Sequence, residues 1–148
     1  MNTCTPIQKP FIWSRFLLVA LSAIFLLSSC ATRVNFATST VVPAAEGKVK
    51  VKKDKNNNYA ISIDVENLAE PGRLPMPQNY YIAWAEMDNN TIQNLGQLRT
   101  GAGLLSSKLK ASMQTVSPTK PRRIFITGES AVAATYPGTY VVLNTTSF

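Results

Sequence analysis

Histidine is absent from this 148-residue chain, and cysteine occurs only twice, at Cys4 and Cys30. Without histidine, and with no cysteine after position 30, the usual pairs of nucleophile and general base and most zinc sites cannot form beyond Cys30. An internal disulfide is excluded there for the same reason. We therefore expect no metal or other cofactor, and no enzyme that depends on these side chains.

Acidic residues are also scarce, with eight against fifteen basic ones and a formal net charge of +7. Glu86 and Asp88, like Asp64 and Glu66, stand two apart, so each pair shares one side of a strand. An acid-catalysed enzyme would need such carboxylates, or Glu129. We expect ordinary solvated strand and turn residues instead, and no catalytic activity.

A partial calcium-loop pattern runs from Asp54 to Asn58 (DKNNN). Its sixth position is Tyr59, where such loops need glycine, and its twelfth is Val65, where they need a bidentate glutamate. The segment therefore predicts a turn rather than a metal site.

The first thirty residues have the pattern of an export signal. Residues 1–15 carry Lys9 and Arg15 without an acid, and the apolar run Phe16–Leu27 follows. Small residues then end the run, as they do at a signal-peptide cleavage site. An uncleaved membrane-spanning helix is the alternative, but only the front of the uncharged window is strongly apolar.

The tetrapeptide Leu27-Ser28-Ser29-Cys30 resembles the lipobox of bacterial prolipoproteins. The resemblance implies cleavage between Ser29 and Cys30, a diacylglyceryl group on the Cys30 thiol and a further acyl chain on its amine. We expect a signal peptide at 1–29, a lipidated N-terminus with a flexible tether at 30–47, and one domain at 48–148. The protein would be lipid-anchored in the cell envelope outside the cytoplasm. In a cell with two membranes we expect the outer membrane, facing the periplasm, because Ala31 replaces the aspartate that resembles an inner-membrane retention signal.

Alternation of apolar and polar residues begins at Lys48. Val49 and Val51 alternate with lysines, and Tyr59–Val65 alternates in the same way after the Asp54–Asn58 turn. Period two predicts strands, so these segments should form a hairpin. A register that pairs their apolar residues also places lysine opposite Asp64 or Glu66.

Further segments have the same character and are separated by Pro, Gly, Asn and Asp: Tyr80–Met87, Thr91–Leu98, Leu104–Met113, Arg122–Thr127 and Thr139–Thr145. About seven short strands predict an all-β fold, specifically an antiparallel, immunoglobulin-like β-sandwich. Trp84 is expected in its core, between the two sheets, with Leu95, Leu98, Phe125 and Val142. A surface ligand platform is the alternative for Trp84.

The second half shows a resemblance of its own, carried by Tyr81-Ile82-Ala83-Trp84, Asn94-Leu95-Gly96-Gln97-Leu98, Ile124–Glu129, Tyr136-Pro137-Gly138 and Val141-Val142-Leu143. These motifs resemble, in order, the extracytoplasmic domain of anti-sigma-K-type factors. The resemblance implies a β-sandwich and does not imply an activity. Direct contact with a sigma factor is not expected, because the cytoplasmic helical domain of that family has no counterpart here.

Lys48, Lys50 and Lys52 form the strongest basic row, and on a strand all three point the same way. They could contact an anionic surface such as lipid headgroups, or they could protect an exposed edge strand from pairing. Nucleic acid is not an expected partner, because exposed aromatic residues are not interleaved with the basic residues of the chain. We expect a protein-interaction or structural module, with a ligand-binding or stress-sensing module for a glycan or lipid as the alternative.

Overall fold

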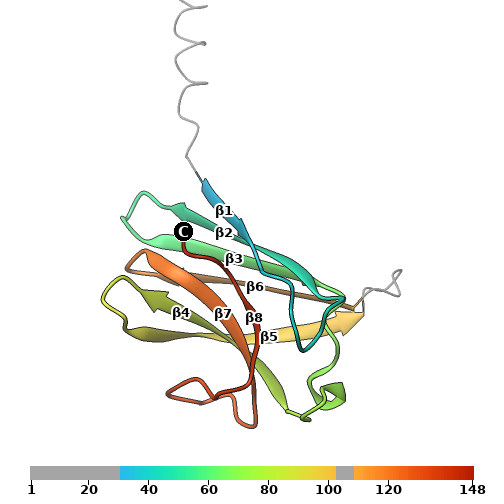
Figure 1. Ribbon diagram of the computed structural model, residues 1–148. Helices are drawn as coiled ribbons and strands as arrows, with labels where there is room; N and C mark the ends of the chain where they lie inside the picture. Colours follow the sequence, from blue (N-terminus) through green and yellow to red (C-terminus); the bar gives the residue numbers. More distant parts are fainter. Residues whose placement is uncertain (1–30, 103–108) are drawn as a thin grey trace, which may run out of the picture.

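The computed structural model describes residues 31–102 and 109–148, and the regular secondary structure of these residues is almost entirely β (Figure 1). The all-β expectation is confirmed. The only helix among them is one 3-10 turn, η1 (Pro71–Arg73). The strands are β1 (Ala31–Asn35), β2 (Glu46–Lys53), β3 (Tyr59–Glu66), β4 (Tyr80–Met87), β5 (Ile92–Ala102), β6 (Leu109–Ser117), β7 (Pro121–Glu129) and β8 (Val141–Asn144).

All eight strands belong to one strongly curled antiparallel sheet, in the order β1-β2-β3-β6-β5-β4-β7-β8. The long strand β5 joins its two halves. Residues 92–98 of β5 pair with β4, and residues 99–102 pair with β6. A bulge opposite Ala83 and Trp84, where Gly96 adopts a φ of +115°, increases the local twist. The expected seven-stranded immunoglobulin-like sandwich of two separate sheets is therefore replaced by one continuous sheet.

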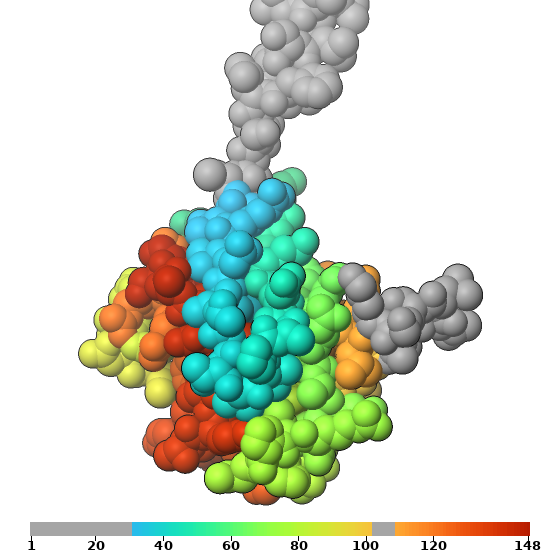
Figure 2. Space-filling model, turned by 45° about the vertical axis from the view of Figure 1, so that its right-hand side comes forward, coloured from blue at the N-terminus to red at the C-terminus, as the bar shows by residue number. Residues whose placement is uncertain are grey.

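The segments that directly follow β1 and β8 meet between the two edges of the curled sheet. Phe36 forms an isolated bridge with Thr145, and the Ser39 hydroxyl donates a buried hydrogen bond of 2.6 Å to the Val142 carbonyl. Figure 2 shows β1 and the segment after it lying against the C-terminal part of the chain. The expected tether at 30–47 is thus wrong for residues 31–47, which belong to the fold. Apolar contacts hold this segment in the fold, because Val34 pairs with Val49 and Phe36 packs over Gly47.

The hairpin predicted from alternation is confirmed as β2 and β3. Val49 lies opposite Ile63, and Lys48 lies opposite Asp64, so one face is apolar and the other carries opposite charges. Asp54 closes the turn because its Oδ1 accepts the backbone N–H groups of Asn56 and Asn58, at 2.8 and 2.9 Å. Asp54 is therefore a turn residue, as predicted.

The main core lies between the two halves of the sheet. Its largest fully buried members come from both halves: Tyr81, Ile61, Ile63, Leu68, Leu98, Ile124, Ile126, Leu143, Val49 and Val65. Tyr81 keeps its hydroxyl satisfied by donating to the Ala69 carbonyl at 2.8 Å. Burial, and secondarily the neighbouring Tyr140, raises the pKa of Tyr81 above its ordinary value, so this phenol stays neutral.

A second apolar cluster lies on the outer face of the β4–β7 half. Ile82, Trp84 and Phe125 form it, and Tyr80 and Ala134 pack against it. Trp84 is fully buried, as predicted, but it does not pack with Leu95, Leu98 and Val142, which belong to the main core. The expectation of one shared core is wrong because Trp84 and Tyr81 differ in parity on β4, and a loop covers the outer face.

Candidate functional site

The two ends of the folded domain differ in their connections. The end where β1 begins carries three short turns, at 54–58, 88–91 and 118–120. The opposite end carries long connections, at 36–45, 67–79 and 130–140. We call these the short-turn end and the long-loop end (Figure 1). β1 runs from Ala31, at the short-turn end, toward the long-loop end.

The three predicted lysines lie exposed on the outer face of β2. β2 pairs with β1 on one side and with β3 on the other. Protection of an exposed sheet edge, one of the two interpretations of Lys48, Lys50 and Lys52, is therefore wrong. The positive charge of these three lysines therefore needs an explanation other than edge protection.

Cross-strand register divides this row. Lys48 lies opposite Asp64, an acidic neighbour. Lys50 lies between Arg33 and Ser62, and Lys52 lies between Ala31 and Ala60. Positive charge thus accumulates toward the short-turn end, where Lys50 and Lys52 lack an acid directly opposite.

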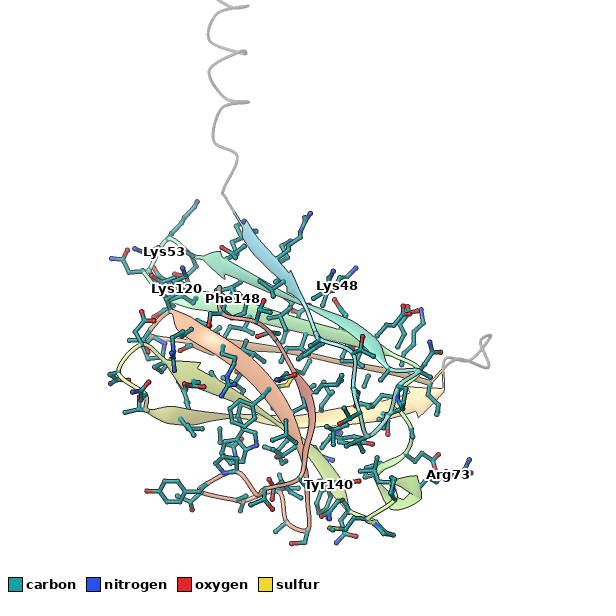
Figure 3. All side chains as sticks on the ribbon, in the orientation of Figure 1. Lys48, Lys53, Arg73, Lys120, Tyr140 and Phe148 are labelled. Atoms are coloured by element: carbon teal, nitrogen blue, oxygen red, sulfur yellow. The ribbon has the colours of Figure 1, made fainter. Side chains whose placement is uncertain are left out.

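Charge is distributed unequally between the two ends. The half nearer the short-turn end carries eight bases and three acids: Arg33, Lys50, Lys52, Lys53, Lys55, Lys120, Arg122 and Arg123 with Asp54, Glu86 and Asp88. The half nearer the long-loop end carries four bases and five acids among the described residues: Lys48, Arg73, Arg99 and Lys110 with Glu46, Asp64, Glu66, Glu70 and Glu129. The respective net charges are +5 and −1. Figure 3 shows Lys53 and Lys120 at the short-turn end and Arg73 at the other.

Two of the carboxylates considered as acids, Glu86 and Glu66, are paired with basic side chains. Glu86, with a side chain 12% exposed, pairs with Arg122 and, at 2.6 Å, with Arg123 Nη2. Burial opposes ionisation of Glu86, but hydrogen bonds and charge from Arg123 and Arg122 outweigh it and lower the pKa. Glu66 pairs with Lys110 at 3.2 Å. These contacts commit both carboxylates to ion pairs with basic side chains.

Glu129 holds a loop in place. The buried Trp84 indole N–H donates to Thr127 Oγ1 at 2.8 Å, and that hydroxyl donates to Glu129 Oε1 at 2.6 Å. The same carboxylate oxygen accepts the Gly138 backbone N–H at 2.7 Å. This chain of bonds joins β4 and β7 to the 130–140 loop, which sequence alone did not indicate.

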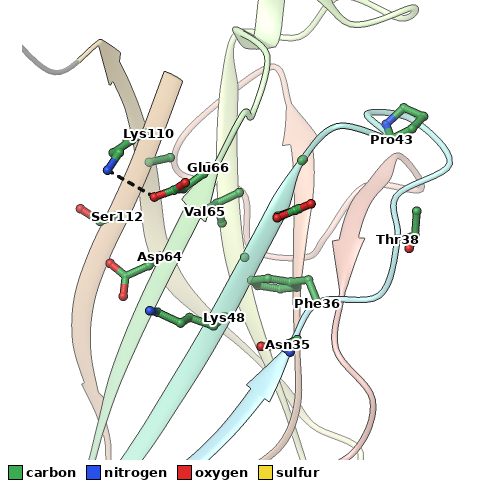
Figure 4. A pocket seen from close by; sticks show the side chains of 14 residues that line it. Asn35, Phe36, Thr38, Pro43, Lys48, Asp64, Val65, Glu66, Lys110 and Ser112 are labelled. Carbon is green, nitrogen blue, oxygen red and sulfur yellow. Dashed lines mark ion pairs between the residues drawn. The ribbon is translucent and has the colours of Figure 1, made fainter. Parts of the chain in front are cut away.

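A cavity of about 700 Å³ lies where the 36–45 segment turns back beside β2, β3 and β6 (Figure 4). Its polar lining includes Lys48, Asp64, Lys110 and Ser112, and Phe36 supplies an aromatic surface. The space is partly open to solvent, and its lining mixes charged side chains with one aromatic ring. Only Lys48 of this set was predicted as a contact residue.

The long-loop end also exposes large apolar side chains. Tyr136 is 79% exposed and Met76 is 58% exposed, on the 130–140 and 67–79 connections, and Val132 accompanies them. Exposed aromatic and methionine side chains are typical of protein-interaction surfaces. They were not singled out from the sequence, because exposure depends on the loop conformations.

The predicted lipidation and cleavage residues, Cys30 and Ser29, lie outside the described residues. Within 31–102 and 109–148, no helix is long and apolar enough to cross a membrane. No three potential metal-ligating side chains come together in that part of the chain. Comparison with protein-family models, with curated proteins and with solved structures finds no match.

Proposed function

We propose that this chain is a lipid-anchored protein of the bacterial cell envelope, whose β-domain is a protein-interaction or structural module. One observation carries the proposal: β1 begins at Ala31, directly after the lipobox-like segment ending at Cys30. Ala31, the residue after Cys30, is held in the folded domain by its pairing with Lys52. All eight strands of the described residues lie after the proposed cleavage site between Ser29 and Cys30.

The interaction surface in this proposal is the long-loop end. A lipid on Cys30 would hold the short-turn end nearest the membrane and leave the long loops farthest from it. Tyr136, Val132 and Met76 are exposed on those loops. The Glu129 contacts to Thr127 and Gly138 fix the 130–140 loop, which lowers the entropy lost when a partner binds.

The anchor is tested by mass spectrometry and membrane fractionation of the protein from its host. We expect a mature chain that begins at Cys30 and carries two or three acyl chains. Cys30→Ser should remain as unprocessed precursor, whereas Cys4→Ser should be processed normally and serves as the matched control. Normal processing and lipid-like membrane retention of Cys30→Ser would refute the proposal.

The interaction surface is tested by site-specific photocrosslinking in intact cells. A photoreactive residue at Tyr136 should yield a discrete crosslinked species. The same residue at Val116, which is 55% exposed on the outer face of β6, is the matched control and should not yield it. Equal crosslinking at both positions would argue against a long-loop interface.

A second candidate function, binding of an envelope glycan or lipid, is favoured by the cavity beside Phe36. Thermal unfolding of the full-length protein with glycan fragments tests it. Ligand should raise the melting temperature, and Lys110→Ala should reduce that rise, whereas Arg73→Ala should not. The resemblance to extracytoplasmic domains of anti-sigma-K-type factors is compatible with this sensing role. Contact with a sigma factor is not part of the proposal.

A further inference from the structure

We propose that the basic short-turn end is a docking surface for anionic lipid headgroups, which orients the domain on its own membrane. This inference rests on the proposed lipid anchor at Cys30. It adds that the domain is seated on the bilayer rather than suspended above it. The residues are Arg33, Lys50, Lys52, Lys53, Lys55 and Lys120.

Covalent connection places the anchor beside these residues. Consecutive Cα atoms are about 3.8 Å apart, so Cys30 lies next to Ala31. Ala31 pairs with Lys52 across the β1–β2 ladder. Since residues 31–35 are held in the sheet, no free segment separates the anchor from the folded domain.

Two of the three acids at this end, Glu86 and Asp54, are already engaged. Glu86 is paired with Arg122 and Arg123. Asp54 Oδ1 accepts two backbone N–H groups of its own turn. Lys52, Lys53 and Lys55 are exposed, so their charges are available to an external anion.

A lipid surface fits this patch better than an acidic protein or a nucleic acid. The anchor would hold headgroups permanently within about 10 Å, the screening length at 0.1 M salt, so attraction acts without a separate binding event. Each lysine near an anionic bilayer strengthens binding by about fivefold. The described residues of the long-loop half, with a net charge of −1, gain nothing from the same surface. Charge therefore favours one orientation, with the long loops pointing away.

Lysine footprinting tests the orientation on the intact lipidated protein. The protein is reconstituted in vesicles of phosphatidylcholine alone or with phosphatidylglycerol, treated briefly with an acetylating reagent and analysed by mass spectrometry. In anionic vesicles we expect acetylation of Lys52, Lys53 and Lys55 to slow by about threefold or more, and Lys110 to change little. High salt should remove the difference. Uniform reactivity in both vesicle types, or greater protection of Lys110, would overturn the inference.

Charge reversal supplies matched variants. Lys52→Glu, Lys53→Glu and Lys55→Glu together should abolish the anionic protection of Lys50. The control set changes the charge equally at the other half: Arg73→Glu, Arg99→Glu and Lys110→Glu. It should leave the protection of Lys50 intact. Circular dichroism establishes that both sets remain folded, and equal effects of the two sets would contradict a local docking surface.

Failure of the two proposals would look different. A protein without acyl mass that is released from vesicles by a salt wash would defeat the proposed anchor and this inference with it. A retained, acylated protein whose lysine reactivity ignores phosphatidylglycerol would defeat only the docking surface.

Discussion

Replacing Thr127 by valine removes one hydroxyl that serves two partners and changes little in shape. The Trp84 indole is fully buried, and its N–H donates to Thr127 Oγ1 at 2.8 Å. Valine leaves this donor buried without an acceptor, which costs about 1–3 kcal/mol. The hydrogen bond from Thr127 to Glu129 is lost as well. We expect Thr127→Val to lower the free energy of unfolding by about 1–3 kcal/mol.

A double-mutant cycle separates the hydrogen bond from packing. Trp84→Phe destabilises by leaving space in the second cluster, but it also removes the indole N–H. With phenylalanine at position 84, Thr127→Val no longer strands a buried donor. The double variant should therefore lose less than the sum of the single variants, by about 0.5–3 kcal/mol.

Urea unfolding followed by circular dichroism measures each step, since Trp84→Phe removes the only tryptophan after residue 30. Thr32→Val is the matched control, because Thr32 lies exposed on a strand and its substitution should change stability by less than about 0.5 kcal/mol. Additive effects in the cycle would refute the reasoning, as would a Thr127→Val variant as stable as the wild type.

Three further predictions concern other parts of the fold. A Cβ at Gly47 would lie 2.8–2.9 Å from backbone and side-chain atoms, so Gly47→Ala should destabilise by about 1–3 kcal/mol in thermal unfolding, whereas Gly72→Ala, with nothing within 4 Å, should not. Because Glu86 has a lowered pKa when folded, it stabilises the fold above its ordinary pKa of 4.5 and loses this contribution as the pH falls through the folded value. Urea unfolding at decreasing pH should show that the free energy of unfolding of Glu86→Gln falls less on acidification than that of the wild type. A fragment of residues 45–148 lacks β1 and should melt well below residues 31–148 in calorimetry, and equal melting temperatures would show that β1 adds nothing.

Local pattern was enough to predict the β2–β3 hairpin and most strands, because period two and turn residues are short-range properties. β1 was missed although Val34 and Phe36 alternate with Arg33 and Asn35. Five residues among small polar neighbours are a weak signal, and this strand is stabilised by pairing with β2 and by the distant contact between Phe36 and Thr145. Such contacts are not encoded in the spacing of nearby residues.

Trp84 illustrates a different limit. Its burial could be predicted from residue type, but its face depends on the 130–140 loop, which covers the outside of β4. The nearly continuous apolar run of β4 (YYIAWAEM) is itself a sign of a strand covered on both faces. Likewise, the sequence alone shows the lysine row. Only the structure shows that Glu86 and Asp54 are bound to other groups and therefore do not neutralise these lysines.

The seam between the chain's two ends constrains when the protein can finish folding. The bond from Ser39 to Val142 spans 103 residues, and the bridge from Phe36 to Thr145 spans nearly the whole domain. A chain that emerges N-terminus first, from a ribosome or through a translocation channel, cannot close this seam until its last few residues are out. Contacts of such long sequence separation slow folding. Until then the edge strand β1 lacks its contacts with the C-terminal segment, and an uncovered edge favours pairing with other strands.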